Sequence, residues 1–225
     1  MMSVFGGCCE SKCKKRKQSE NLLAGVPKFP LLRALRFTKE LSMEEFKSLE
    51  ELTEMDEKHN LMGAICGSVP SLEKMHKYLS QELLNDEAPD EIKGQFNVAK
   101  NMALYSYYFY ALAPEVHLKI YTVIEHALRL RVNPKKRMMF KALINHAVSQ
   151  RWINDAGFRH IDNPSPDNEW CKSMVEVMPS LRNSKAHGSS MLVGDCLHHI
   201  SSCADFVNQL FPASKTRNNS SKKDA

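Results

Sequence analysis

Apolar residues recur three and four positions apart along most of this chain, and this spacing is typical of one buried face of an α-helix. The pattern predicts helices over residues 42–59, 71–83, 89–110, 115–131, 139–152, 170–182 and 197–211. Ser42 and Glu45 have the spacing of a capping box, Ser71 can cap the helix that follows it, and Pro89 precedes two acidic residues. The sequence therefore predicts an all-α protein.

Breaks in the pattern suggest how the chain is organised. Gly63, Gly67 and Pro70 are expected to end the first helix, and residues 155–169 are expected to form a loop. The predicted parts are a flexible, basic, Cys-containing tail (1–28), an N-terminal helical extension (29–88), an up-and-down helical bundle (89–212) and a disordered tail (213–225).

Composition narrows the setting of the protein. The 225 residues are 43% hydrophobic, which can supply one sizeable core, and the net charge of +5 permits an RNA partner without requiring one. No apolar run resembles a secretory signal or a membrane span, so no membrane partner is expected. Seven cysteines form no obvious disulfide framework. A cytoplasmic location is therefore predicted.

The stretch Leu181–Gly188 carries the densest candidate chemistry. It reads Leu-Arg-Asn-Ser-Lys-Ala-His-Gly and lies where the helix predicted at 170–182 ends. The guanidinium of Arg182 can grip two phosphate oxygens, and the imidazole of His187 can move protons near neutral pH. On an unbroken helix these two side chains point about 140° apart. They converge only if the helix breaks or if a second subunit supplies one of them.

With Asn183 directly after the arginine, the motif Arg-Asn-x-x-x-His between two helices resembles the signature of the HEPN superfamily. The resemblance covers about residues 100–212. It implies an HEPN-like bundle that acts as a metal-independent endoribonuclease, without a cofactor, on RNA. His187 would serve as general acid or base, Arg182 would stabilise the charge on phosphorus, and Asn183 would orient the loop or donate to the phosphate. In this mechanism the 2′-hydroxyl of the substrate attacks the adjacent phosphate.

The family resemblance also implies a homodimer in a defence or toxin-like role, and it leaves room for an inhibitory or regulatory protein partner. Two further residues are candidates for lining the site, Glu125 and Lys185. Tyr121, Glu125 and Arg129 resemble the early core helix of HEPN domains, which often offers a polar residue to the active cleft. The same spacing of Glu125 and Arg129 also fits an ordinary solvated ion pair.

Two alternatives stay open at this level. The first is a non-catalytic module of the same fold that binds nucleotide or protein partners. The second is a zinc-containing helical adaptor, because Cys196, His199 and Cys203 share one helix face; three ligands on one helix lack a fourth, so no metal is expected. Phosphate-binding loops, nucleophile elbows and zinc-protease motifs are absent from the sequence.

Overall fold

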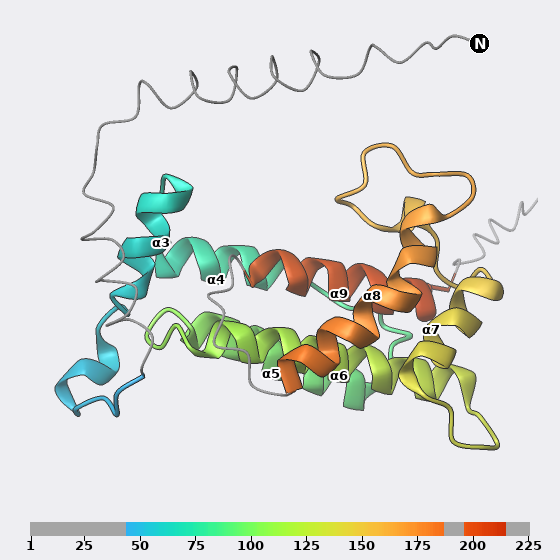
Figure 1. The fold of residues 1–225 in the computed structure, drawn as a ribbon, viewed down its shortest axis with the longest axis horizontal. Coiled ribbons are helices and arrows are strands. Elements are labelled where there is room, and N and C mark those ends of the chain that lie inside the picture. Colours follow the sequence, from blue (N-terminus) through green and yellow to red (C-terminus); the bar gives the residue numbers. More distant parts are fainter. Residues whose placement is uncertain (1–43, 187–195, 215–225) are drawn as a thin grey trace, which may run out of the picture. The chain divides into compact units, whose positions relative to one another are not determined.

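The protein is described from a computed structural model, which describes residues 44–186 and 196–214. The α-helices in these ranges are α3 (Lys58–Cys66), α4 (Leu72–Gln81), α5 (Asp90–Tyr105), α6 (Leu112–Val132), α7 (Phe140–Ser149), α8 (Glu169–Ala186) and α9 (Leu197–Leu210) (Figure 1). Two short 3-10 helices, η2 (Glu50–Thr53) and η3 (Asp155–Gly157), complete them. The tail expected at 1–28, most of the tail expected at 213–225, and His187 with Gly188 lie outside the described residues.

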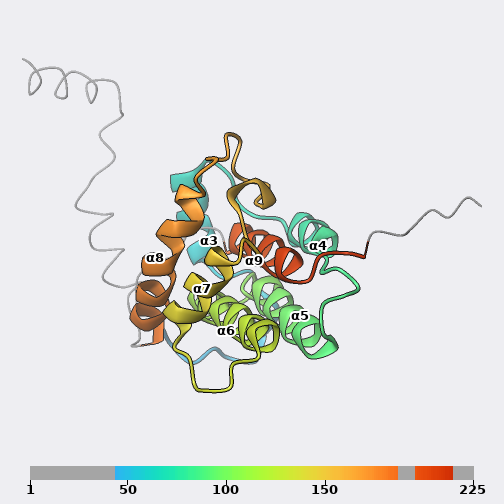
Figure 2. The same cartoon turned by 90° about the vertical axis from the view of Figure 1, so that its right-hand side faces the viewer.

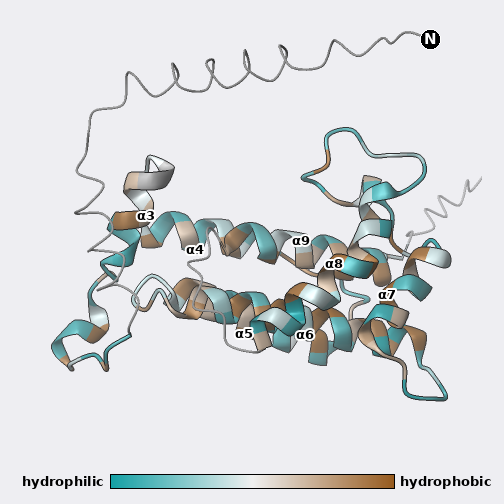
Figure 3. Cartoon of the chain, viewed as in Figure 1, coloured by the Kyte–Doolittle hydropathy of each residue, from teal (hydrophilic) through white to brown (hydrophobic). Residues whose placement is uncertain are grey.

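These helices pack together as an all-α bundle, and the described ranges contain no strand. The bundle belongs to a compact unit that begins at Glu45. Each helix carries both apolar and polar residues, as expected where one face is buried and the other is exposed (Figure 3). Within the described part of the chain, no helix combines the length and the apolar character that a membrane span requires.

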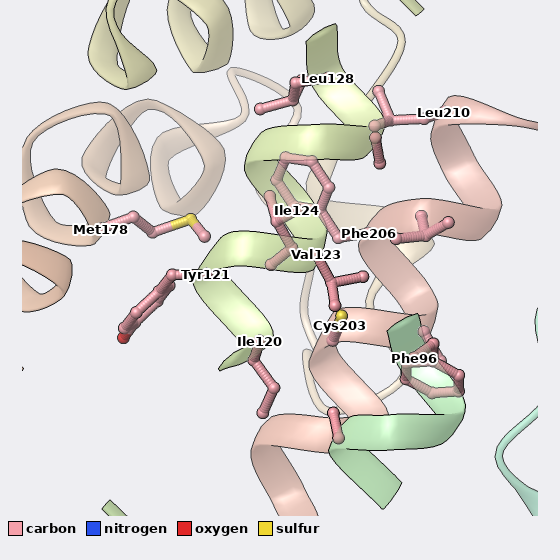
Figure 4. Packing of buried hydrophobic residues seen from close by; sticks show 14 of the residues in the cluster. Phe96, Ile120, Tyr121, Val123, Ile124, Leu128, Met178, Cys203, Phe206 and Leu210 are labelled. Carbon is pink, nitrogen blue, oxygen red and sulfur yellow. The ribbon is translucent and has the colours of Figure 1, made fainter. Parts of the chain in front are cut away.

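Helix α6 is the centre of the bundle. It packs against α5, α7, α8 and α9, and a view nearly along its axis shows these helices around it (Figure 2). This position explains why α6 is apolar on more than one side. Its buried residues are Ala113, Val116, His117, Ile120, Tyr121, Val123, Ile124, Ala127 and Leu128. Figure 4 shows Met178 of α8 and Phe206 of α9 on opposite sides of it.

A charged network joins the end of α4 to α9. Glu82 and Asp205 are buried carboxylates, and the Arg159 guanidinium binds both, with Nη2 2.6 Å from Glu82 Oε2 and Nε 2.6 Å from Asp205 Oδ1. Ser201 Oγ donates to Glu82 Oε1 at 2.9 Å and contacts the Tyr78 hydroxyl at 2.5 Å. The arginine side chain is 59% exposed, so one partly solvated cation pairs with two carboxylates that are largely shielded from water.

The loop expected at residues 155–169 holds the beginning of α8. Asp155 is buried, and its two carboxylate oxygens accept hydrogen bonds from the backbone N–H groups of Trp170 and Cys171 at 3.2 and 2.9 Å. The Asn168 side chain accepts in turn from the Asp155 backbone N–H. The first turn of a helix leaves its N–H groups unpaired, so this carboxylate acts as a cap from outside the helix.

The helix predicted at residues 42–59 is wrong over residues 44–57, which form no α-helix. Residues 45–49 are not helical, η2 forms a single turn, and α3 begins only at Lys58. The apolar side chains of Phe46, Leu49 and Leu52 are exposed, so packing against the rest of the protein does not stabilise a long helix here. Asp56 instead accepts hydrogen bonds from the backbone of Lys58 and Tyr110, which fixes the chain in a turn before α3.

The expectation that Gly63 interrupts a helix is also wrong. Gly63 lies within α3, and a Cβ at this position would meet Val69 Cγ2 at 2.6 Å. The glycine therefore allows the chain after α3 to pass close to the helix. The helix ends at Gly67, whose φ of 83° favours a residue without a side chain.

Candidate functional site

The last turn of α8 carries three of the residues that the sequence singled out. Arg182, Asn183 and Lys185 all lie on α8, which continues to Ala186 without a break before the described range ends. Its inner face, including Met174 and Met178, packs against α6 and α7. The relation between Arg182 and His187 lies outside the described residues.

Arg182 meets Glu125 across the contact between α8 and α6. Arg182 Nη2 lies 3.5 Å from Glu125 Oε2, and Arg129 Nη2 lies 2.6 Å from Glu125 Oε1. The Glu125 side chain is only 17% exposed, whereas that of Arg182 is 43% exposed. Arg182 Nη1 also donates to Asn183 Oδ1 at 3.2 Å. Two guanidinium groups thus share one carboxylate, which leaves a net positive charge and free donors on the Arg182 side.

Lys185 and His117 form a second polar group on the inner side of the same helices. Within the described part of the chain, Lys185 Nζ and His117 Nε2 are buried and have no hydrogen-bond partner. The His117 ring stacks on the ring of His199 from α9, with centroids 3.9 Å apart and an interplanar angle of 26°. Burial lowers the pKa of His117 to about 3, and the charges of His199 and Lys185 act in the same direction. His117 is therefore neutral at physiological pH.

A cleft separates α8 from α9, each of which packs against α6. Its volume is about 320 Å³, and Ile120, Tyr121 and Ile124 of α6 line the part of it that lies against α6. Figure 4 shows Tyr121 on the side of α6 that faces Met178. Tyr121 also has a raised pKa because of burial, so its hydroxyl stays protonated. The cleft is thus a largely apolar slot, with hydroxyl and imidazole groups among its lining.

Imidazole and indole rings close one end of the cleft. His160 packs edge-on against Trp170 and His198, with centroids 4.8 and 5.1 Å apart, and Phe158 packs against Trp170 at 4.4 Å. Burial, together with the charge of His198, lowers the pKa of His160. All of these contacts involve the loop before α8. Its acidic residue Asp155 accepts hydrogen bonds from the first turn of α8, while Phe158 and His160 line the cleft.

The zinc hypothesis gains no support from the geometry. No group of three metal-binding side chains comes together among the residues that the structure describes. Cys203 is fully buried on α9, and burial raises the pKa of its thiol, which favours the protonated form over the thiolate that zinc binds. Its helix neighbours Cys196 and His199 face Ser106 and His117 instead.

A homodimer would need an apolar contact surface, and the described helices differ in what they offer. Helix α9, which follows Gly188 in the chain, is largely buried in the bundle, with Ile200, Phe206 and Leu210 in the core. At the aromatic end of α5, Tyr105 is exposed and lines an apolar hollow of about 570 Å³, whereas Tyr110 is buried. The aromatic end therefore remains as the candidate contact surface.

Comparison with protein-family models found no match, and neither the curated proteins nor the solved structures include one that is significantly similar to this chain. The resemblance to HEPN domains consequently rests on the motif residues of the sequence alone.

Proposed function

We propose that this chain is a metal-independent endoribonuclease of the HEPN type. The observation that carries the proposal is the contact of Arg182 with Glu125. It joins the helix that carries Arg182 and Asn183 of the motif to the helix whose Tyr-x-x-x-Glu pattern resembles the HEPN core helix. The exposed guanidinium is held in place by a carboxylate and still has donors for a phosphate.

In the proposed reaction the substrate's 2′-oxygen forms a bond to phosphorus while the bond from phosphorus to the 5′-oxygen breaks. A base takes the 2′-hydroxyl proton and an acid protonates the leaving 5′-oxygen, which yields a 2′,3′-cyclic phosphate and a 5′-hydroxyl. His187 is the group that transfers one of these protons, since imidazole titrates near the working pH. Arg182 stabilises the negative charge that develops on the phosphoryl oxygens.

Asn183 and Lys185 have supporting roles in this proposal. The Asn183 carbonyl accepts a hydrogen bond from Arg182, which restricts the guanidinium to one orientation. Lys185 adds positive charge on the same turn, and its ammonium lacks an acceptor in the described structure. A phosphate would satisfy such a buried donor. Two-fold pairing of subunits is the arrangement that would bring Arg182 of one chain close to His187 of another.

The test is cleavage of an end-labelled single-stranded RNA in excess EDTA, with the all-deoxy oligonucleotide of the same sequence as substrate control. Cleavage of the RNA alone is expected, with cyclic phosphate ends. Arg182→Ala and His187→Ala should each slow cleavage by about a hundredfold or more. His76→Ala, at an exposed position on α4, is the matched control and should keep full activity. Intact RNA with the wild-type protein, or wild-type rates for His187→Ala, would contradict the mechanism.

Mixing the two inactive variants tests the shared site. If each catalytic pair is drawn from two chains, the mixture of Arg182→Ala and His187→Ala proteins should regain part of the activity. Sedimentation of the wild-type protein as a monomer at micromolar concentration would instead require both residues to act within one chain.

The second candidate is a non-catalytic module of the same fold that binds RNA. The Glu125 carboxylate favours it, because this group competes with any phosphate for the Arg182 guanidinium. In this case Glu125→Gln should tighten RNA binding, measured by fluorescence anisotropy, and neither protein should cut. For the enzyme, Glu125→Gln should slow cleavage because Arg182 loses its anchor.

A further inference from the structure

The cleft between α8 and α9 has the size and shape of a site for a small planar ligand. Its volume of about 320 Å³ lies at the lower end of the range for small-molecule sites, ~300 to 1,000 Å³. Two of its lining residues from the opposite helices, Val177 and His198, are exposed, so the slot opens to solvent between them. Nothing in the reaction proposed above uses this cleft.

The rings at its end suggest what kind of group it takes. His160 contacts Trp170 and His198 edge to face, so the faces of these three rings are not all stacked against one another. Unpaired bases of RNA are recognised by stacking on such rings, which contributes about 1–3 kcal/mol per base. An imidazole ring carries two nitrogens that can exchange hydrogen bonds with the edge of a base. An aliphatic ligand would leave these polar groups without partners.

The position of the cleft relates it to the proposed phosphate site. Leu181 lines the cleft and is followed in the chain by Arg182, while Ile124 lines it and is followed by Glu125. The ion pair of Arg182 and Glu125 therefore borders the cleft on the side where α8 and α6 meet. Trp170 and Arg182 are twelve residues apart on α8, about 18 Å along the helix axis, so a base at the ring end of the cleft belongs to a different nucleotide of the strand from the one whose phosphate meets this guanidinium.

We propose that the cleft between α8 and α9 binds one unpaired base of the RNA substrate, with His160, Trp170 and His198 as its contacts. This inference rests on the proposed function for the identity of the substrate. It assigns the cleft to recognition of a nucleotide in the strand near the cleaved phosphate, whereas Arg182 and His187 carry out the cleavage.

The test uses Trp170 as a reporter and free nucleotides as probes. The chain has two tryptophans, and Trp152 does not line the cleft, so a Trp152→Phe protein reports from Trp170 alone. AMP, GMP, CMP and UMP are titrated separately, with ribose 5-phosphate as the probe that lacks a base. Saturable quenching by at least one nucleotide, and none by ribose 5-phosphate, is expected.

Variants locate the binding. In the same background, His198→Ala should weaken nucleotide binding about fivefold or more, the lower end of the stacking contribution. Ser202→Phe, which fills the cleft from α9, should abolish it, and His76→Ala on α4 should leave it unchanged. Far-UV circular dichroism and thermal melting verify that each variant folds. Unchanged binding by both folded His198→Ala and folded Ser202→Phe would overturn the assignment.

The two proposals fail in different ways. If RNA is cleaved in EDTA but the nucleotides quench Trp170 no more than ribose 5-phosphate does, the base site is wrong and the ribonuclease stands. If the nucleotides bind with the expected variant effects but RNA stays intact, the base site stands and the cleavage proposal fails.

Discussion

The buried imidazole of His117 determines how the stability of the protein should depend on pH. The residue is 4% exposed, and burial, followed by the charges of His199 and Lys185, lowers its pKa from 6.5 to about 3. Between these two values the unfolded chain binds a proton at His117 that the folded protein does not bind. The free energy of unfolding therefore rises with pH across this window and falls as the solution is acidified from pH 7.

The expected magnitude follows from the same two pKa values. With about 6.5 in the unfolded chain and about 3 in the folded protein, His117 should lower the free energy of unfolding by about 2 kcal/mol between pH 7 and pH 5. A His117→Gln variant carries a polar side chain that stays neutral at every pH, so it should lack this contribution. Urea unfolding at pH 7, 6 and 5 measures the difference between the two proteins.

His76→Gln is the matched control, because His76 is exposed on α4 and should leave the pH dependence as it is in the wild type. Other groups also titrate in this range, but they are common to all three proteins and cancel in the comparison. If the His117→Gln and wild-type proteins lose the same free energy between pH 7 and pH 5, the imidazole is not held neutral in the core and the reasoning fails.

Three further substitutions test the packing by urea unfolding at pH 7. Arg159→Ala leaves two buried carboxylates without their cation and should lower the free energy of unfolding by about 3–5 kcal/mol; a loss below 1 would show that the network is dispensable. Gly157→Ala displaces the Gln209 amide from the position of the new Cβ and should lower the free energy of unfolding by about 1 kcal/mol, whereas Gly94→Ala, in open space on α5, should raise it by up to about 1 kcal/mol. If both glycine substitutions shift the free energy of unfolding in the same direction, the geometry around these two positions is contradicted. Asp155→Ala removes the α8 cap and should cost about 1–2 kcal/mol, and an unchanged midpoint would exclude that role.

Most of the helices after residue 89 could be predicted, since each has an apolar face with helical spacing. Their ends could not. The face predicted at 89–110 continues through Tyr107 and Tyr110, but α5 ends at Tyr105. Beyond it, Asp56 donates its backbone N–H to the Tyr107 carbonyl and accepts from the Tyr110 N–H. A residue about fifty positions earlier in the chain thus pairs the backbone just after this helix, and no local pattern reveals it.

The candidate site also combines residues that the sequence predicted with contacts that it could not predict. The sequence placed Arg182, Asn183 and Lys185 near a helix end, and the structure places them on the last described turn of α8. His117 was not singled out, although it lies three and four positions before Ile120 and Tyr121 on the buried face of α6. This helical spacing was the one signal in the sequence that His117 is buried. Its stacking on His199 depends on how α6 and α9 are rotated against each other, which a periodicity does not specify.

Three features that destabilise the folded protein are found in helices α6 and α8. Pro179 lies inside α8 and removes a backbone hydrogen bond from that helix, Lys185 Nζ is buried without an acceptor, and the His117 imidazole is held neutral. All three belong to α6 and α8, the helices that line the cleft. An unpaired buried ammonium, a desolvated imidazole and a proline within a helix are each unfavourable for folding, so stability alone does not explain these residues. Departures of this kind are expected where a fold serves a ligand. Pro179→Ala restores the missing backbone hydrogen bond of α8 and should therefore stabilise the protein, while it impairs whichever activity the end of α8 carries. A stabilised variant with full activity would show that the proline has no functional role.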